Sequence, residues 1–249
     1  MSQYADQLGF AAGTLIGIRK DISGITPVRF GVLQDVSVDF SADLKELYGQ
    51  GRYSIALAPG KTKIEVKAKF AGLKGNLFNH LYFGATSAKT QIVYTDNEPG
   101  VIPSATAYIV TVSKSATFIA DCGVFYALTG QPLTLVASAP TVGQYMVAAG
   151  VYTFAVADAS AAVYISYTAG STAGIMIPLT NVRMGTGPSF QLVLDQPFDG
   201  RAQTLILNNC QTSKFSLPSK QDDWTIAEMD IMCSADISGN IGTLSMSNA

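Results

Sequence analysis

The chain has few charged residues. Only 14% of its 249 residues are Asp, Glu, Lys or Arg, while 48% are hydrophobic. An average soluble domain has roughly 25% charged residues. Ser, Thr, Ala, Gly and Asn must therefore cover much of the surface. Because such a surface does little to keep copies of the chain apart, the composition favours burial of part of it against other subunits.

Histidine and cysteine are also scarce. His80 is the only histidine, and hydrolase triads normally need a histidine in a partnered setting, so we interpret it as a packed or surface residue. Cys122, Cys210 and Cys233 lie far apart and form no CxxC pair. We interpret them as buried or half-buried thiols without a zinc or redox role. The sequence predicts no catalytic residue, no metal site and no cofactor.

Nucleotide, nucleic-acid and membrane motifs are missing as well. Gly185-Thr186-Gly187-Pro188 lacks the third glycine of a dinucleotide loop, and no GxxxxGK[ST] phosphate loop occurs. The net charge of −2 and a pI near 5.3 disfavour tight nucleic-acid binding, which needs clustered Lys and Arg. The N-terminal residues 1–6 show no leader pattern and no apolar run approaches 18 residues, so we expect a product made in the cytoplasm with no membrane span.

Acidic pairs and the single tryptophan have plain interpretations. Asp222-Asp223 and Glu228/Asp230 could serve as two-carboxylate machinery, but a solvated loop and a strand face are the expected roles. Trp224 could be a sugar platform, although an indole that anchors a strand start or a subunit contact is more common.

Alternation of apolar and polar residues is the strongest local pattern, and it predicts a mainly β chain. Residues 36–40 and 64–70 alternate cleanly and predict half-buried antiparallel strands. Between them, residues 44–61 mix apolar residues with Gly and charge, which predicts a long functional connection or one with its own strand. Residues 73–84 have helical apolar spacing closed by Gly84, which predicts one short helix.

Composition predicts an interrupted domain. Residues 85–103 have the Asp, Asn, Pro and Gly content of a turn and linker. Residues 105–174 are nearly free of charge and contain short β-type runs between Gly, Pro and Ala turns, which predicts a small β-sandwich or barrel. We therefore expect one domain formed by 1–95 and 175–249, interrupted by a β module over 104–173.

Several phrases of the sequence resemble bacteriophage tail tube proteins, also called major tail proteins. The resemblance covers nearly the whole chain, but it is one of pattern and phrase, and no single short motif is diagnostic. It is carried by residues 13–17, 30–40, 45–50, 70–84, 214–230 and 239–244. The stretch Gly143-Gln144-Tyr145, residues 150–154 and residues 165–167 look like inserts found in such phage proteins.

The resemblance implies a fold of two packed antiparallel sheets with a flanking helix. It also implies hexameric rings that stack into a tube, whose inner sheets form a continuous barrel. In such tubes a long loop between two early strands reaches the neighbouring ring, and residues 44–60 are placed to be that loop. The inter-ring residues would be Leu44, Leu47, Tyr48, Gly49 and Ile55. Implied partners are other copies of the chain, the tape-measure protein, the tail terminator and baseplate or tip proteins, in a virion tail assembled in the host cytoplasm.

A tube that passes viral DNA without binding it should have a neutral or acidic inner wall, because clustered Lys and Arg would hold the phosphates. Strand faces opposite apolar rows are the candidates for this wall: Asp35, Ser37, Asp39, Glu228 and Asp230. Lys63, Lys67 and Lys69 should then lie away from the channel or pair with those acids across strands.

Two alternatives stay open. The inner tube of a contractile injection system or a bacterial secretion tube shares the fold. A β-rich virion adhesin that binds host-surface sugar or protein is a different class, and its first residues to test would be Tyr145, Tyr152, Tyr164 and Tyr167. An enzyme is the least favoured class.

Overall fold

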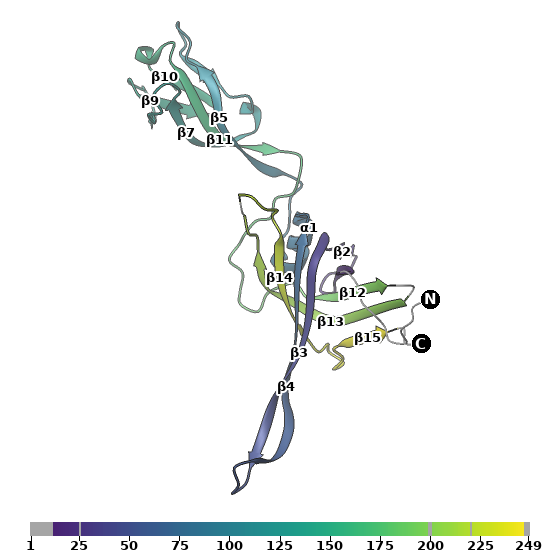
Figure 1. The fold of residues 1–249 in the computed structure, drawn as a ribbon. Coiled ribbons are helices and arrows are strands. Elements are labelled where there is room, and N and C mark those ends of the chain that lie inside the picture. Colours follow the sequence, from purple (N-terminus) through teal and green to yellow (C-terminus); the bar gives the residue numbers. More distant parts are fainter. Residues whose placement is uncertain (1–11, 25, 199–200, 220, 247–249) are drawn as a thin grey trace. The chain divides into compact units, whose positions relative to one another are not determined.

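The computed structural model describes residues 12–24, 26–198, 201–219 and 221–246. The chain is 55% strand and 7% helical, so the expectation of a mainly β chain with antiparallel sheets and one short helix is confirmed. It divides into two compact units (Figure 1). Unit 1 contains Met1–Thr86 and Ile177–Ala249, and unit 2 contains Ser87–Met176. The outermost residues of the predicted segments 1–95 and 175–249 lie outside the described residues.

Unit 1 is built on one eight-stranded sheet in the order β2-β1-β12-β13-β14-β4-β3, with β15 also paired to β13. The resemblance implied two packed sheets in this part of the chain, whereas its described strands form one hydrogen-bonded sheet. All its pairings are antiparallel. The strands are β1 (Thr14–Arg19), β2 (Val28–Arg29), β3 (Val32–Tyr48), β4 (Ser54–Ala71), β12 (Phe190–Phe198), β13 (Arg201–Ser216), β14 (Ala227–Ser234) and β15 (Gly242–Met246).

A short helical segment covers the core face of this sheet. It begins with α1 (Gly75–Phe78), continues as the π-helical turn η1 (Asn79–Phe83), and ends at Gly84 in the left-handed conformation. Leu77 and Leu81 are fully buried, and the Phe78 ring lies 4.6 Å from the Phe215 ring of β13. These contacts fix the segment on the sheet, because burial of its apolar face supplies most of the stability of so short a helix.

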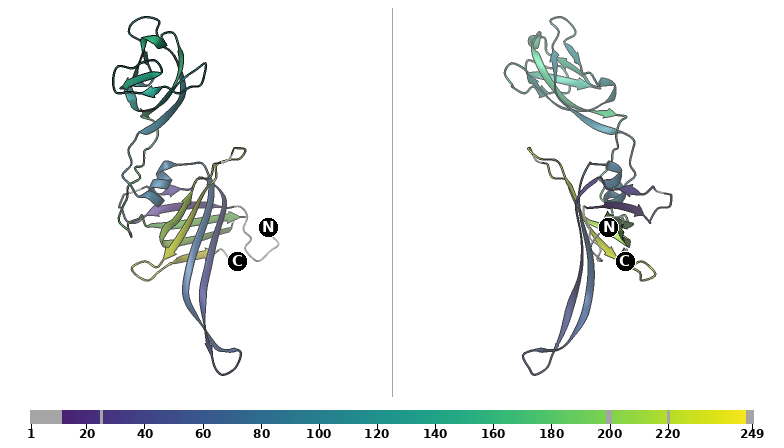
Figure 2. Two further views of the ribbon diagram at one scale, coloured as in Figure 1. Left: turned by 90° about the vertical axis from the view of Figure 1, so that its left-hand side faces the viewer. Right: turned by 45° about the vertical axis from the view of Figure 1, so that its right-hand side comes forward.

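The hairpin of β3 and β4 extends far beyond the rest of unit 1 (Figures 1 and 2). Near its base, the inward row of β4 packs into the core, with Ile64, Val66, Ala68 and Phe70 all buried. Further along, from Phe40 to the turn and back to Lys63, the side chains are exposed apart from the half-buried Ser54. We call residues 40–63 the arm.

Unit 2 has a three-stranded and a four-stranded sheet with a common core. The first sheet has the order β5-β11-β7 and the second β6-β10-β9-β8, in which β8 and β9 are parallel. Its elements are β5 (Gln91–Val101), β6 (Ile109–Thr111), η2 (Ser115–Thr117), β7 (Phe118–Tyr126), β8 (Thr134–Leu135), β9 (Gln144–Ala148), β10 (Val151–Phe154), η3 (Val156–Asp158) and β11 (Ala162–Ser171).

The linker predicted over residues 85–103 is wrong, because most of it is strand β5. β5 pairs with β11 along its length, and the register shifts opposite Ile165 and Tyr167. Asn97 lies at this shift with φ of 51°. Asp96 and Asn97 at a β-bulge, followed by Pro99 and Gly100, look like a turn in sequence, although a bulge lets the strand continue past it.

Candidate assembly surfaces

The segment predicted as a loop, residues 44–60, is the far part of the β3–β4 hairpin. Leu44 is paired with Pro59, Leu47 with Ala56 and Tyr48 with Ser54, so only residues 49–53 form the turn between the strands. A plain loop was therefore the wrong interpretation, and the alternative of a segment with its own strand is the correct one. Pro59 interrupts donation along β4, which is tolerated because this part of β4 has no second neighbour among the described strands.

The arm exposes large apolar side chains. Exposed fractions are 64% for Leu44, 60% for Leu47, 58% for Tyr48 and 69% for Ile55. Sequence reasoning missed Phe40, Tyr53 and Leu57, which are exposed by 60% or more and belong to the same surface. Gly49 lies in the turn, where a Cβ would meet nothing closer than the Ile55 side chain at 3.7 Å. An isolated two-stranded hairpin is marginally stable in water. A partner that covers these apolar side chains would stabilise the arm.

Apolar groups lie on both faces of the arm. Leu47 and its partner Ala56 share one face, whereas Leu44 lies on the other together with Leu57, the partner of Glu46. An ordinary half-buried strand would place charge on one face and apolar groups on the other. The arm therefore differs from the base of the same hairpin and fits a site where both faces are covered.

The predicted wall residues come together on one face of the sheet at the base of the hairpin. Asp35, Ser37 and Asp39 of β3 and Glu228 and Asp230 of β14 flank the central strand β4. Each lies opposite the core row that contains Val66 and Met229. The structure thus groups all five residues, although they come from strands almost 200 positions apart in the sequence.

Lysines share this face with the acids. Lys69 lies between Asp35 and Glu228, and Lys67 lies between Ser37 and Asp230. Lys69 Nζ is 3.8 Å from Glu228 Oε1, with both side chains partly exposed. Such a pair contributes roughly 0–1 kcal/mol, so its main effect is to balance charge. Lys214 of β13 is also in register with Asp230, so the face carries lysines and carboxylates side by side.

The free sheet edges add a third candidate surface. β3 lies at one end of the sheet order and has no outer neighbour among the described strands. Unpaired backbone N–H and C=O groups along a 17-residue strand can pair with another strand. Both the base and the arm of this strand carry charged side chains, Asp35 and Asp39 on the base and Asp43, Lys45 and Glu46 on the arm.

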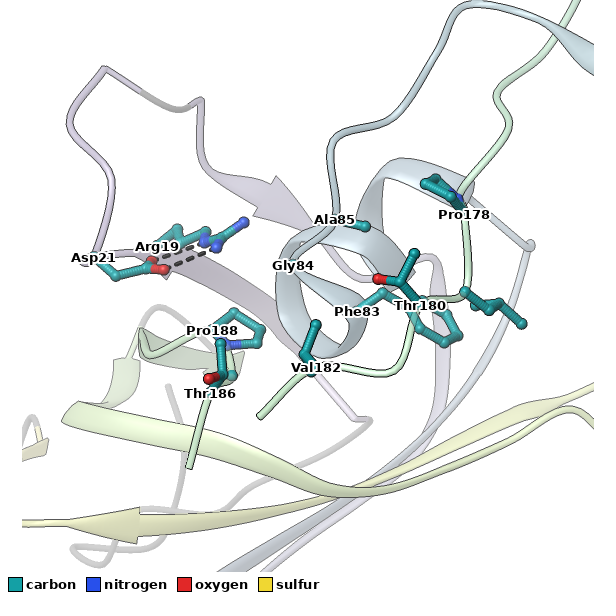
Figure 3. Close-up of a pocket in the computed structure, with 12 residues that line it drawn as sticks. Arg19, Asp21, Phe83, Gly84, Ala85, Pro178, Thr180, Val182, Thr186 and Pro188 are labelled. Atoms are coloured by element: carbon teal, nitrogen blue, oxygen red, sulfur yellow. Dashed lines mark hydrogen bonds and ion pairs between the residues drawn. The ribbon is translucent and has the colours of Figure 1, made fainter. Parts of the chain in front are cut away.

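A cavity of about 350 Å³ lies beside the helical segment (Figure 3). Arg19 donates to Asp21 through Nε at 2.7 Å and through a terminal nitrogen at 2.8 Å, and this bond lowers the pKa of Asp21. The remaining lining is mostly apolar or backbone, including Phe83 and Pro188. His80 is nearby in sequence but does not line the cavity, and burial together with the Arg19 charge lowers its pKa. Among the described residues that line the cavity there is no histidine, cysteine or lysine.

Other chemical candidates are dispersed. Trp224 is 85% exposed, and Asp222 and Asp223 lie with it in the connection before β14. The described part of the chain contains no group of three or more His, Cys, Asp or Glu side chains that could hold a metal ion. No helix in that part is long and apolar enough to span a membrane.

Comparison with known proteins adds no assignment, since no protein-family model and no curated protein matches the chain.

Proposed function

We propose that the chain is a structural subunit of a phage tail tube, which self-assembles into stacked hexameric rings and forms a conduit for tape-measure protein and viral DNA. The observation that carries this proposal is the arm, a long hairpin with apolar side chains exposed on both faces. The sequence resemblance supports it independently. The low charge of the chain favours the same conclusion, because few like charges oppose close packing of copies.

Burial of the arm supplies a driving force for assembly. Fully burying a large apolar side chain contributes about 1.5–3 kcal/mol, and Leu44, Leu47, Tyr48 and Ile55 still expose 58–69% of their surfaces. Each therefore offers about 1–2 kcal/mol on contact with a second copy. Repeated around a ring and along a stack, such contacts stabilise a closed polymer.

The charged face suits a conduit. Asp35, Asp39, Glu228 and Asp230 repel phosphates, while Lys67 and Lys69 lie between them in register. DNA that passes such a wall meets Lys67, Lys69 and Lys214 each beside a carboxylate, which weakens their hold on the phosphates. We place this face toward the lumen, so that DNA slides without specific binding.

In this proposal the other partners are the tail terminator and baseplate or tip proteins, which contact the ends of the tube. The subunit is made in the host cytoplasm and ends in the virion tail. The same surfaces serve equally well in the inner tube of a contractile injection or secretion system. The presence of a sheath around the isolated tube distinguishes these two assemblies.

The proposal is tested by negative-stain microscopy and sedimentation of Leu47→Asp/Tyr48→Asp. Both residues are more than half exposed, so the variant should fold with an unchanged circular dichroism spectrum. Loss of apolar burial together with a buried unpaired carboxylate should cost more than about 4 kcal/mol per contact. The critical concentration for tubes should rise by about 1,000-fold.

Ile237→Asp is the matched control, because Ile237 is fully exposed in a turn of the same unit but lies outside the arm. It should assemble like the wild type. Wild-type protein that stays monomeric both alone and with the other tail components would refute the proposal. Tubes formed normally by the arm variant would show that the arm makes no assembly contact.

A second candidate function, glycan binding by unit 2, is favoured by a specific surface. Of the four tyrosines named as the first to test for sugar binding, Tyr145, Tyr152 and Tyr167 are buried at 2%, 0% and 0% exposure. Those three are packing residues and cannot contact a ligand. Tyr164 is 39% exposed on the face of the three-stranded sheet that points away from the core.

Tyr164 is the centre of an aromatic face. In register with it are Pro99 of β5 and Phe125 of β7, and Tyr94 lies further along β5 with 57% exposure. The Tyr94 hydroxyl donates to Asp96 Oδ1 at 3.1 Å. Flat rings can pack against sugar C–H groups while an exposed carboxylate accepts hydroxyl hydrogens.

A glycan array probed with the full chain tests this candidate. Tyr94→Ala/Tyr164→Ala should abolish a wild-type signal, while Tyr53→Ala, which removes a still more exposed aromatic from the arm, should retain it. The absence of any glycan signal from the wild-type chain, or a signal unaffected by the double substitution, would refute glycan binding at this face.

A further inference from the structure

Two of the three cysteines lie directly opposite each other in unit 1. Cys210 of β13 and Cys233 of β14 are register partners, and their Sγ atoms are 2.7 Å apart. Directly opposed residues of antiparallel strands have Cα atoms about 4.5–5.5 Å apart, which is within the range of about 4.4–6.8 Å that a disulfide spans. The backbone therefore needs no rearrangement for the two sulfurs to be joined.

The two thiols differ in accessibility. Cys210 is fully buried in the unit 1 core, beside Phe190 in register on β12, whereas Cys233 is half-buried. The hydrogen bond from Cys210 lowers the pKa of Cys233, and the same contact together with burial raises the pKa of Cys210. Cys233 is thus the sulfur that a small oxidant reaches first, and Cys210 is placed to resolve the product. Cys122 belongs to unit 2 and is exposed, so the expectation of a buried or half-buried thiol is wrong for it.

We propose that Cys210 and Cys233 are a disulfide-forming pair that is oxidised when the protein leaves a reducing cytoplasm. The bond itself follows from the geometry of the subunit, while the change of compartment rests on the proposed function, since a virion tail assembled in the cytoplasm later enters an oxidising medium. The oxidant is a peroxide or a low-molecular-weight disulfide.

The chemistry balances with either oxidant. With hydrogen peroxide, the Cys233 thiolate attacks one oxygen, gives a sulfenic acid and releases hydroxide, which takes up a proton to become water. The Cys210 thiol then displaces the sulfenic oxygen as a second water, and the S–S bond forms. With oxidised glutathione, Cys233 forms a mixed disulfide and releases one glutathione, and Cys210 then displaces the second.

The bond would join the two strands at the centre of the unit 1 sheet. β13 pairs with β12 and β15 as well as with β14, and β14 pairs with β4, whose continuation is the arm. The bond would also close the connection that contains Trp224. A closed loop of this size stabilises mainly by restricting the unfolded chain, and we expect a rise in melting temperature of roughly 5–10 °C.

The experiment uses the full chain with Cys122→Ser, which leaves Cys210 and Cys233 as the only thiols. The protein is purified under reductant and incubated with an excess of oxidised over reduced glutathione. Thiols are then counted with Ellman's reagent in denaturant. We expect both free thiols to disappear, a mass lower by two hydrogens, and a cross-linked peptide that contains both cysteines after non-reducing digestion.

Cys233→Ala in the same background is the control. Its half-buried position makes it tolerant of truncation, and it should keep one free thiol, gain no internal bond and show no oxidant-dependent rise in melting temperature. Two thiols that persist in the oxidised parent, or a bond found only between molecules, would overturn the proposed pair.

Failure of this inference is separable from failure of the proposed function. An oxidised monomer that never assembles would support the pair and refute the tube, whereas tubes made from protein with two persistent thiols would do the reverse. Peptide mapping of tubes isolated in a thiol-blocking buffer shows whether the pair is oxidised after the protein leaves the cytoplasm. Reduced cysteines in isolated extracellular particles would refute that part.

Discussion

Asp121 of β7 holds the two sheets of unit 2 together, and its removal gives the most quantitative test of the structure. Its Oδ2 accepts from the Tyr145 hydroxyl at 2.5 Å, and its Oδ1 accepts from the Tyr152 hydroxyl at 2.9 Å. Oδ1 also accepts from the Gly123 N–H at 3.2 Å. Both tyrosines belong to the opposite sheet and are almost completely buried.

Asp121→Ala leaves two buried hydroxyls without their acceptor. A hydrogen bond to a charged acceptor is worth about 1.5–3 kcal/mol, so the pair sums to about 3–6 kcal/mol. Asp121 is half-buried, and water can partly replace its carboxylate, which favours the lower part of that range, about 3–4 kcal/mol. For a unit the size of Ser87–Met176, the melting temperature should fall by roughly 15–25 °C.

The assay is calorimetric unfolding of the full chain, with Lys89→Ala as the control because Lys89 is an exposed charged residue of the same unit. The control should change stability by less than about 0.5 kcal/mol. Asp121→Ala/Tyr145→Phe/Tyr152→Phe should recover at least half of the loss, since removing both partners leaves no buried polar group unpaired. A mild effect of Asp121→Ala, or no recovery in the triple variant, would refute this account of the core.

Three further predictions concern the wall, the two units and alkaline pH. Asp35→Lys/Asp39→Lys should still form tubes but eject DNA more slowly, with a delay that shrinks at higher salt; unchanged ejection rates would remove these residues from the lumen. Replacement of residues 87–176 by a short Gly/Ser bridge should still permit tubes. The ends to be joined are adjacent, because the backbones of Ala88 and Met176 are hydrogen-bonded to each other in both directions. An unfolded product would show that unit 1 needs unit 2 to fold. Burial and then the hydrogen bond to Asp158 raise the pKa of Tyr126 to about 12, above the unfolded value near 10. The stability that the neutral Tyr126 hydroxyl contributes is therefore complete below pH 10 and is lost between pH 10 and about 12. Urea unfolding across this window should show a smaller loss for Tyr126→Phe, and equal pH profiles would contradict the assignment.

Local patterns in the sequence were enough for the class of fold and for individual elements. Alternation in residues 36–40 and 64–70 predicted strands whose core rows are partly or fully buried, apart from the exposed Phe40. Apolar spacing with Gly84 predicted the helical segment, although it begins at Gly75 and Leu73 is exposed. These predictions succeed because backbone period and side-chain polarity are properties of neighbouring residues.

The ends of elements depended on pairing that the sequence does not contain. Residues 44–60 looked like a loop because Gly49, Gly51 and Pro59 break the alternation, yet β3 and β4 support each other across bulges. β5 was missed for the same reason. A bulge residue is unfavourable in an isolated strand and acceptable once the partner strand continues the ladder.

By itself, the sequence determined that this is a charge-poor, mainly β chain with one short helix. Only the tertiary structure decided which residues meet: Lys69 between Asp35 and Glu228, Cys210 against Cys233, and Tyr145 and Tyr152 on one half-buried carboxylate. The physical reason is that the two-residue repeat of a strand assigns each side chain to one face of the sheet. The register between distant strands decides which side chains are its neighbours and whether anything covers that face.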